Sequence, residues 1–395
     1  MKILVINSGS SSIKFQLIEM PSKIVIASGL VERIGLYNAE LHYKTETNAI
    51  DTLTEIQNHS VGLEKIVDLL LDRKVGVIQS TDDIAIIGHR VVHGGSTFTD
   101  TTVIDKKVKD KIKSLFSLAP LHNPSNYEGI VVAENMFPKA TQVAVFDTAF
   151  HQTIPEKAYK YAIPNELLND HKVRLYGFHG TSHKYVSEKA IEYLQLQTSK
   201  IIVIHLGNGC SMTAVHNGKS IDHSLGFSPT NGLIMGTRSG DIDHGLIFHM
   251  VDNLGYTLKD VNTVLQKKSG MLGLTGHSDL RDIEAKAAKG DKNCTLALEM
   301  NAYRIKKYIG SYTAAMNGLD AIVFTAGIGE NSATMRQLVC KDMSYFNLIL
   351  DEELNAIRSP EIRTISTTDS KTKILVIPTN EELEIAKQCY TLSGN

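Results

Sequence analysis

The sequence predicts an α/β fold in which mixed sheets are flanked by helices and divided between two related domains. A buried apolar strand, a polar turn with glycine and a second strand occur at residues 3–18, and this pattern returns at 201–215. Apolar residues at helical spacing fall between the strand segments. A chain of 395 residues also exceeds what one core usually holds, so we expect two domains.

The first half of the chain predicts a sheet that is partly antiparallel. Residues 3–6 form a continuous apolar run, which is typical of a strand buried on both faces. Leu63, Ile66 and Leu70 have helical spacing. Strands are expected at 3–6, 13–18, 23–31, 40–44, 84–87 and 143–146, and helices at 60–73, 106–116 and 126–137.

The second half alternates strands, glycine-containing turns and helices. Val186, Ala190 and Leu194 share one face of a helix that begins near residue 182. Loops are expected at 176–180 and 230–245, and a glycine turn at 326–331. Strands are expected at 201–204, 212–215, 321–325 and 374–377, and further helices at 246–254, 258–268, 279–289, 294–316 and 381–390.

Composition and charge exclude several classes of function. Forty-one basic residues against 43 acidic ones give a net charge of -2, which provides no overall field for nucleic acid or an anionic membrane. No apolar run approaches the ~18–20 residues of a membrane span, and Asn7 comes too early for a signal peptide. The 4 cysteines show no C-x-x-C spacing, which disfavours a zinc site or a disulfide framework. We expect a cytoplasmic protein with free thiols.

Three glycine turns follow predicted strands, at residues 7–12, 205–209 and 326–331. Backbone N–H groups in such turns can bind the phosphates of a nucleotide. The first turn also offers serine hydroxyls, the Lys14 ammonium and the Asn7 amide, a candidate metal ligand. Any one of these turns is more simply a strand connection, but three together favour an anion site.

The common nucleotide signatures are incomplete in this chain. Residues 218–220 read Gly-Lys-Ser, as at the end of a P-loop, but Thr213 stands where the first glycine belongs. The G-x-G sequences at 207–209 and 327–329 lack the third glycine of a dinucleotide site. The sequence therefore predicts neither a Walker site nor a dinucleotide site.

Two arginines lie in unusual surroundings. Arg90 follows His89 in an apolar segment, and Arg238 lies among small residues in Gly-Thr-Arg-Ser-Gly. A guanidinium matches a carboxylate or a phosphoryl group with two parallel hydrogen bonds. The simpler alternative for Arg238 is an ion pair with Asp241 or Asp243.

Histidines recur four residues apart, as His89 with His93 and His179 with His183. Both segments are bounded by glycine and lack H-E-x-x-H, so a zinc site is disfavoured. His179, between Phe178 and a glycine, is a candidate donor toward developing negative charge. A loop histidine bonded to backbone is the alternative.

Two carboxylates stand at the ends of predicted elements. Asp147 ends a strand, where catalytic carboxylates are often placed in α/β folds, although it can equally cap the residues that follow. Glu381 opens the last helix, where a carboxylate stabilises the dipole by ~0.3–1 kcal/mol without any functional role. Its alternative role is to bind Mg²⁺ together with Asn7, because hard cations take oxygen ligands.

Eight segments in order resemble the acetate kinase (acetokinase) family across nearly the whole chain. They are INSGSSSIKF, GHRVVHGG, VFDTAFH, YGFHGTSH, HLGNG, GTRSGDID, FTAGIGEN and PTNEE. The resemblance implies the sugar-kinase and actin-like ATPase superfamily, with two ribonuclease-H-like domains, an active site in the cleft between them and a homodimer. It places the N-terminal domain at 1–149 with 382–395, and the nucleotide-binding domain at 150–381.

The resemblance also implies the ligands of individual residues. Asn7 and Glu381 would hold Mg²⁺, for which Mn²⁺ can substitute. ATP or ADP would be bound by Lys14, Ser10, Ser12, His205, Leu206, Gly207, Asn208, Gly209, Asp279, Leu280, Arg281, Gly327, Ile328, Gly329, Glu330 and Asn331.

The same resemblance assigns the acceptor site and the catalytic groups. Arg90 would bind the carboxylate of acetate, and Asp147, His179 and Arg238 would act in catalysis with it. The methyl pocket would be formed by Val92, Leu121, Phe178 and Pro229. Because a carboxylate is already ionised at pH 7, we expect Asp147 to position an arginine or a metal-bound water more than to remove a proton.

Three alternatives stay open on sequence alone. A methylene in an apolar pocket is worth only ~1–3 kcal/mol, so the substrate can be propionate or butyrate in place of acetate. A phosphoenzyme route competes with direct in-line transfer. A non-catalytic, chaperone-like or filament-forming ATPase module on the same scaffold is disfavoured, because no spare domain follows the last helix and both arginines suit a small anion.

Overall fold

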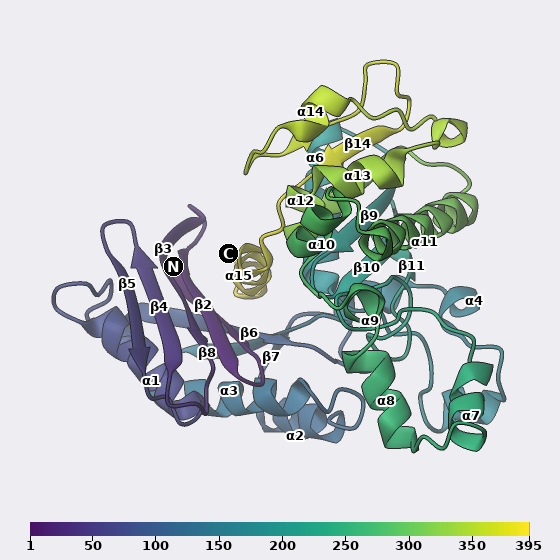
Figure 1. Cartoon of the computed structure of the whole chain (residues 1–395). Coiled ribbons are helices and arrows are strands. Elements are labelled where there is room, and N and C mark those ends of the chain that lie inside the picture. Colours follow the sequence, from purple (N-terminus) through teal and green to yellow (C-terminus); the bar gives the residue numbers. More distant parts are fainter. Residues whose placement is uncertain (395) are drawn as a thin grey trace. The chain divides into compact units, whose positions relative to one another are not determined.

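The structure is a computed structural model that describes residues 1–394, and it divides into two compact units (Figure 1). Unit 1 comprises Met1–Phe150 and Asn380–Asn395, and unit 2 comprises His151–Thr379. Each unit contains one mixed sheet. The two units are described separately below.

Unit 1 contains an eight-stranded sheet in the order β5-β4-β3-β2-β1-β6-β8-β7. Its strands are β1 (Lys2–Ser8), β2 (Ser12–Glu19), β3 (Ile24–Glu32), β4 (Ala39–Thr45), β5 (Ala49–Thr54), β6 (Ile84–Val91), β7 (Thr102–Val103) and β8 (Thr141–Phe146). Its helices are α1 (His59–Leu71), η1 (Thr81–Asp83), α2 (Lys106–Ser114), α3 (Asn123–Met136) and α15 (Glu381–Leu392), and η2 (Ala149–Thr153) lies at the sequence boundary with unit 2.

Helices cover both faces of this sheet because its central strands are apolar on both sides. In β1, Leu4 and Ile6 pack with α1 and α3, whereas Ile3 and Val5 pack with α15. The last helix of the chain thus completes the core around the first strand. Gly88 of β6 permits this approach, since a Cβ there would clash with side chains of α15.

Unit 2 contains a six-stranded sheet in the order β11-β10-β9-β12-β14-β13. Its strands are β9 (Lys200–Leu206), β10 (Cys210–His216), β11 (Lys219–His223), β12 (Ala321–Thr325), β13 (Arg363–Thr364) and β14 (Lys373–Val376). Its helices are α4 (Glu156–Tyr159), α5 (Asn165–Asn169), α6 (Gly180–Leu194), α7 (Gly245–Asp252), α8 (Leu258–Lys267), α9 (Gly270–Thr275), α10 (Leu280–Ala287), α11 (Lys292–Met316), α12 (Ala326–Asn331), α13 (Ala333–Cys340), η3 (Ser344–Phe346) and α14 (Glu352–Ala356).

The two sheets share one topology. In each, an antiparallel hairpin (β1–β2 or β9–β10) continues into a third antiparallel strand on one side. On the other side, two further strands run parallel to the first. The five central strands therefore read third, second, first, fourth, fifth in both sheets. This repeat confirms the predicted α/β fold with two mixed sheets.

The structure corrects several predicted element boundaries. The predicted glycine turn at 326–331 is the helix α12, which follows an extended Thr325. Asn7 belongs to β1 and pairs with Lys14, because the hairpin turn is shorter than predicted. β6 extends through Arg90, which is therefore a strand residue. The sequence pattern missed β5, β7, β11, β13, α4, α5, α9, α13 and α14.

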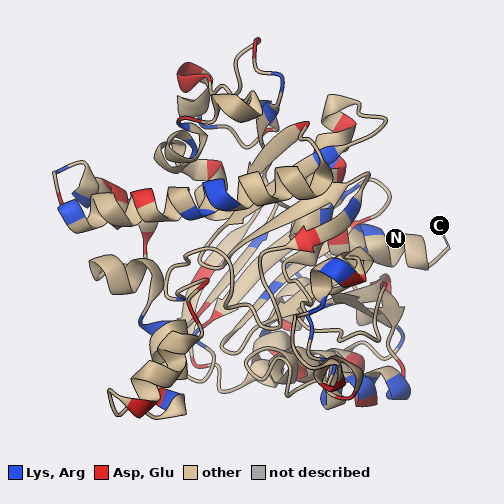
Figure 2. Cartoon of the chain, turned by 90° about the vertical axis from the view of Figure 1, so that its right-hand side faces the viewer, with Lys and Arg blue, Asp and Glu red and all other residues tan. Residues whose placement is uncertain are grey.

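Charges are mixed over the chain. Figure 2 shows Lys and Arg interspersed with Asp and Glu along the helices. The long helix α11, for example, carries Lys292, Glu299 and Arg304. Among residues 1–394, no helix combines the length and the apolar character needed to cross a membrane.

Candidate active site

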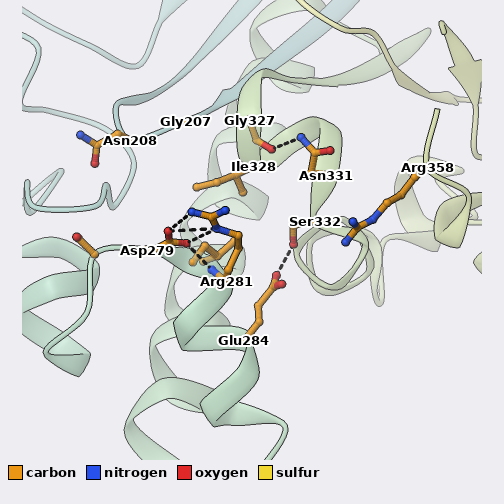
Figure 3. Close-up of a pocket in the computed structure, with 12 residues that line it drawn as sticks. Gly207, Asn208, Asp279, Arg281, Glu284, Gly327, Ile328, Asn331, Ser332 and Arg358 are labelled. Carbon is orange, nitrogen blue, oxygen red and sulfur yellow. Dashed lines mark hydrogen bonds and ion pairs between the residues drawn. The ribbon is translucent and has the colours of Figure 1, made fainter. Parts of the chain in front are cut away.

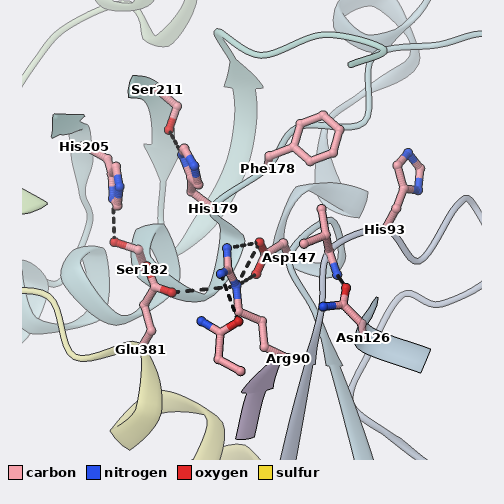
Figure 4. Close-up of polar contacts among 12 residues, drawn as sticks. Arg90, His93, Asn126, Asp147, Phe178, His179, Ser182, His205, Ser211 and Glu381 are labelled. Carbon is pink, nitrogen blue, oxygen red and sulfur yellow. Dashed lines mark hydrogen bonds and ion pairs between the residues drawn. The ribbon is translucent and has the colours of Figure 1, made fainter. Parts of the chain in front are cut away.

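Unit 1 presents an arginine–carboxylate pair at the ends of two parallel strands. Arg90 lies near the end of β6, and Asp147 follows the neighbouring strand β8. The guanidinium donates from Nε to Asp147 Oδ1 at 3.0 Å and from Nη2 to Oδ2 at 2.6 Å (Figure 4). This two-bond geometry fixes both side chains.

Asn7 and Glu381, the predicted metal ligands, meet this pair. Asn7 Oδ1 accepts from Arg90 Nη1 at 3.4 Å, and Glu381 Oε2 lies 3.8 Å from Arg90 Nε. Burial alone would lower the pKa of Arg90, but Asp147 and Glu381 outweigh it and raise that pKa. For Glu381 the effect of burial has the opposite sign: burial is the main cause of its raised pKa, and the negative charges of Asp147 and Glu382 raise it further.

The donor set of unit 1 fits a hard divalent cation. The Asn7 amide oxygen and the Glu381 carboxylate are oxygen ligands, and two protein ligands leave positions for water and phosphate oxygens, as Mg²⁺ prefers. Another group of potential ligands, Glu32, Glu40 and His42, lies on β3 and β4. There Glu40 already pairs with an arginine, and the group includes none of the predicted ligands.

The first hairpin has the tight tip that the sequence predicts. Gly9 N–H donates to the Ser12 carbonyl at 2.8 Å, and Ser10 is exposed in the turn. Lys14 extends from β2 and pairs with Glu382 at 2.6 Å, with half of its side chain exposed. Lys14 is therefore held by α15, a contact that the sequence did not reveal.

In unit 2, His179 stands immediately before α6 in a left-handed backbone conformation (φ 57°, ψ 26°). Its ring does not cap the helix. Instead His179 Nδ1 lies 2.9 Å from Ser211 Oγ on β10, and its ring stacks on His205 with centroids 4.5 Å apart (Figure 4). His205 Nδ1 in turn bonds Ser182 Oγ at 2.9 Å. These contacts orient the ring of His179 beside the 205–209 turn.

Arg238 comes from the loop 230–245 and reaches the same turn. A Cβ built on Gly209 would lie 3.5 Å from the His179 ring and 3.7 Å from Arg238 Nη2, so both side chains border this glycine. Arg238 Nη1 donates to the Pro229 carbonyl at 2.6 Å. In the part of the chain that the structure describes, neither Asp241 nor Asp243 pairs with Arg238; Asp241 bonds Tyr308 and the Gly232 N–H.

Arg238 carries a charge that no carboxylate balances among residues 1–394. Burial lowers its pKa from the ordinary arginine value, and the oxygen partner that the described residues give its guanidinium is the Pro229 carbonyl. An arginine this poorly compensated is suited to an anionic ligand.

A cavity of about 760 Å³ lies next to this turn in unit 2 (Figure 3). It brings together three segments that are far apart in the chain: the turn after β9, the start of α10 and the start of α12. The predicted nucleotide-binding residues that line it are Gly207, Asn208, Asp279, Leu280, Arg281, Gly327, Ile328 and Asn331. Its other lining residues are Ser278, Glu284, Ser332 and Arg358.

Other predicted nucleotide residues lie around this cavity without lining it. Glu330 Oε1 accepts from the Thr379 N–H at 3.1 Å, and burial raises the pKa of Glu330. Gly329 is one of the two buried residues of α12. His205 and Leu206 are the last residues of β9, and Gly209 ends the turn whose Gly207 and Asn208 line the cavity.

The four predicted methyl-pocket residues are divided between the units. Val92 in unit 1 is almost fully buried, whereas Leu121 is 57% exposed. In unit 2, Phe178 is buried and Pro229 is partly exposed. Unit 1 thus offers one exposed apolar side chain from this set.

Several residues that shape the site escaped sequence analysis. Ser211 bonds both His179 and His183, and Arg336 donates to the carbonyls of Gly329 and Glu330 at the end of α12. Arg336 is buried, which lowers its pKa to about 10. The sequence signal available was that Arg336 is the one charged residue among residues 333–340.

The sequence profile of the Acetokinase family matches residues 2–387 of this chain. An acetate kinase of Flavobacterium johnsoniae is 65% identical over 395 residues, which cover 100% of each chain. An acetate kinase of Acetivibrio thermocellus is 48% identical, again over 100% of both chains.

Solved structures agree with these sequence relatives. The crystal structure of Porphyromonas gingivalis acetate kinase superposes with a TM-score of 0.94, 44% identity and coverage of 99% of each chain. A propionate kinase from Francisella tularensis gives a TM-score of 0.92, also with 44% identity and 98% coverage of each. The structural comparison therefore does not distinguish an acetate kinase from a propionate kinase, whereas the two sequence relatives are both acetate kinases.

Proposed function

Because the chain belongs to the acetokinase family, we propose that its residues transfer the γ-phosphoryl group of ATP directly to acetate, reversibly and with Mg²⁺. The products are acetyl phosphate and ADP, so the enzyme is a phosphotransferase with a carboxyl acceptor. The observation that carries the catalytic assignment is the meeting of His179 and Arg238 at Gly209, beside the cavity lined by Gly207 and Asn208.

The unit 2 cavity binds the nucleotide. Backbone N–H groups of the 205–209 turn and of the start of α12 face polyphosphate oxygens, as at other helix N-termini and glycine turns. The starts of α10 and α12 enclose the nucleoside, with Ile328 as the apolar wall and Asp279 and Asn331 as polar partners. Lys14 and the serines of the first hairpin add donors for phosphate.

The acceptor is a carboxylate that needs no general base, because it is ionised at neutral pH. The remaining requirements are to offset the repulsion between two anions and to align them in line. Arg90 binds the acetate carboxylate, and Asp147 holds the Arg90 fork in place. Arg238 and His179 donate to the equatorial oxygens of the transferred phosphoryl group.

Asn7 and Glu381 hold Mg²⁺, for which Mn²⁺ substitutes, because they are the oxygen ligands that surround Arg90 beside Asp147. When bound, the ion neutralises charge on the nucleotide phosphates. In the absence of ligand, Arg90 offsets the negative charges of Asp147 and Glu381. Glu381 is the first residue of α15, so the helix fixes its position.

Acetate is the preferred acceptor over propionate or butyrate. The acetate kinase that is 65% identical supports this choice, whereas an acetate kinase and a propionate kinase structure are each 44% identical. Val92, Leu121, Phe178 and Pro229 would form the pocket for the methyl group, and their packing sets how well one further methylene is tolerated.

The enzyme acts as a homodimer in the cytoplasm. Helix α7 buries none of its residues, and Leu246, Phe248 and the nearby Leu258 are 48%, 61% and 70% exposed. A second copy of the chain would cover this apolar surface. The 4 buried free cysteines suit a reducing compartment. A monomeric mass by light scattering at micromolar concentration would contradict the dimer.

Trapping of the acyl phosphate with hydroxylamine tests the proposed reaction. Purified enzyme is given ATP and Mg²⁺ with acetate, propionate or butyrate in parallel, and each acid without the metal. We expect the highest kcat/KM with acetate and no product without Mg²⁺. A higher value for a longer acid would change the substrate, and no product with any acid would overturn the catalytic assignment. Inversion at a chiral γ-phosphorus would exclude a single phosphoenzyme step.

A further inference from the structure

Two buried histidines hold the peptide that immediately precedes His179. The Phe178 N–H donates to His223 Nε2 at 3.1 Å, and the Phe178 carbonyl bonds His151 Nε2 at 2.9 Å. Both rings are almost fully buried, and their centroids are 4.1 Å apart. Both polar groups of one residue are thus bonded to imidazoles that come from distant parts of unit 2.

The local backbone needs such support. His179 has φ 57°, a left-handed conformation that is strained for a non-glycine residue and persists only where the surrounding structure holds it. Gly177 has φ +76°, and a Cβ there would lie 2.7 Å from the His151 ring. The chain therefore passes directly over His151 before it turns into α6.

The partners define the protonation of both rings. A carbonyl can only accept, so His151 carries a proton on Nε2. An N–H can only donate, so His223 Nε2 is bare and its proton lies on Nδ1, which bonds Thr213 Oγ1 at 2.7 Å. His223 must be neutral to make this contact. Burial, together with the neighbouring His151 and His183, lowers its pKa well below the ordinary value.

A third buried histidine orients the His179 ring. His183 Nε2 lies 2.7 Å from Ser211 Oγ, the atom that also bonds His179 Nδ1, whereas His183 Nδ1 has no partner among the described residues. Because an orphaned N–H is the costlier case, the proton of His183 lies on Nε2. Ser211 then donates to His179 Nδ1, which leaves His179 Nε2 as the donor.

We propose that His151, His223 and His183 are positioning residues that hold His179 as a neutral Nε2–H donor for phosphoryl transfer. They act without touching the substrate: two fix the peptide before His179, and the third orients its ring through Ser211. The inference rests on the proposed role of His179 in the reaction and deepens it.

Kinetics of matched variants at His223 test the proposal. His223→Leu keeps the apolar volume but removes the acceptor, whereas His223→Gln keeps an oxygen acceptor near the position of Nε2. We expect His223→Leu to lower kcat by about 10²-fold, since a small misplacement of a catalytic group has that effect. KM for acetate and ATP should change by no more than about twofold, and His223→Gln should retain most of kcat.

A double-mutant cycle with His179→Ala separates this inference from the proposed function. If His223 acts through His179, His223→Leu lowers kcat no further in the His179→Ala background. An equal loss in both backgrounds, or full kcat in folded His223→Leu, would overturn the inference. If His179→Ala alone keeps full kcat, the catalytic role of His179 fails instead.

The ring nitrogens offer a readout that does not depend on activity, and in which variants serve only for assignment. Nitrogen-15 NMR of the histidine-labelled wild-type enzyme at neutral pH should show His223 as the Nδ1–H tautomer and His151 with its proton on Nε2. The signals are assigned with His223→Gln and His151→Gln. An Nε2–H or cationic His223 would overturn the inference even if the leucine variant did not fold.

Discussion

The two arginines of the candidate site contrast sharply in their surroundings. Arg90 in unit 1 makes a two-bond ion pair with Asp147 and also faces Glu381. Arg238 in unit 2 donates to a carbonyl and contacts a methionine sulfur at 3.5 Å, with no carboxylate partner among residues 1–394. Nearby carboxylates raise the pKa of Arg90, whereas burial lowers that of Arg238.

The contrast shows that the two candidate arginines are prepared for different tasks. Arg90 is already neutralised, so it gives a carboxylate substrate direction and geometry more than net attraction. Arg238 keeps an uncompensated charge, which costs stability in the free protein and favours an anion that gains charge in the transition state. Arg238 should therefore matter more for turnover, and Arg90 more for binding the acceptor.

The largest expected effect is the loss of Arg238. Arg238→Ala should lower kcat by about 10³-fold or more, as arginines that stabilise a phosphoryl group do. Arg238→Lys should recover only part of this, because it restores charge without the planar fork. Steady-state kinetics with acetate and ATP measure both variants.

A matched control is Arg33→Ala, which removes the exposed ion pair with Glu40 and should leave kcat within about twofold. If Arg238→Ala raises KM for ATP and leaves kcat intact, Arg238 is a ground-state binding residue and the contrast with Arg90 disappears.

Asp147→Asn should have the next largest effect, because it removes the charge that compensates Arg90. We expect kcat to fall by about 10²-fold as the arginine fork loses its fixed orientation. KM for acetate should stay within about threefold, since the Arg90 guanidinium remains. Asp351→Asn, which keeps an N-cap on α14, is the control. Full turnover in Asp147→Asn would refute the positioning role.

The smallest effect concerns His89, the residue before Arg90 in β6. Burial lowers the pKa of His89 in the folded chain to about 4, whereas its ordinary value is 6.5. Between these two pH values the unfolded chain binds a proton at His89 that the folded chain does not bind. Stability is therefore complete above pH 6.5 and declines as the pH falls toward 4. From pH 7 to 5.5 this histidine accounts for a loss of about 1.2 kcal/mol.

Urea unfolding of wild type and His89→Asn at pH 7 and pH 5.5 measures this contribution. The variant should lose about 1.2 kcal/mol less than wild type over that interval. Some loss should persist, because burial also lowers the pKa of His93 to about 4. An identical loss in both proteins would show that His89 does not titrate in this way.

Sequence patterns predicted the main strands and the ends at which polar residues gather. Asn7 and Asp147 lie near or after the ends of apolar strands of the unit 1 sheet, and parallel pairing through β6 brings those ends to one edge. His205 has the corresponding place on β9 of the unit 2 sheet. The edge strand β5 was missed because it is polar and largely exposed, so it carries no apolar pattern.

Tertiary contacts decided what the sequence could not. The segment 326–331 contains two glycines, which predict a turn, but buried Arg336 bonds the carbonyls at its end and supports a helix. The supports of His179 were equally hidden, because His151 and His223 are 72 positions apart and each contributes one bond to Phe178. Sequence periodicity within one helix or strand cannot predict a contact between residues so far apart in the chain.

The packing of α15 against β1 sets the order in which the chain can mature on the ribosome. Ile385 and Cys389 belong to the same core cluster as Ile3 and Val5. The core of the unit 1 sheet is therefore complete only after α15 has been synthesised. Unit 2 is complete in sequence at Thr379 and has no such dependence. During translation the later unit can fold before the earlier one, and a nascent chain that stalls short of residue 381 leaves one face of the first sheet uncovered.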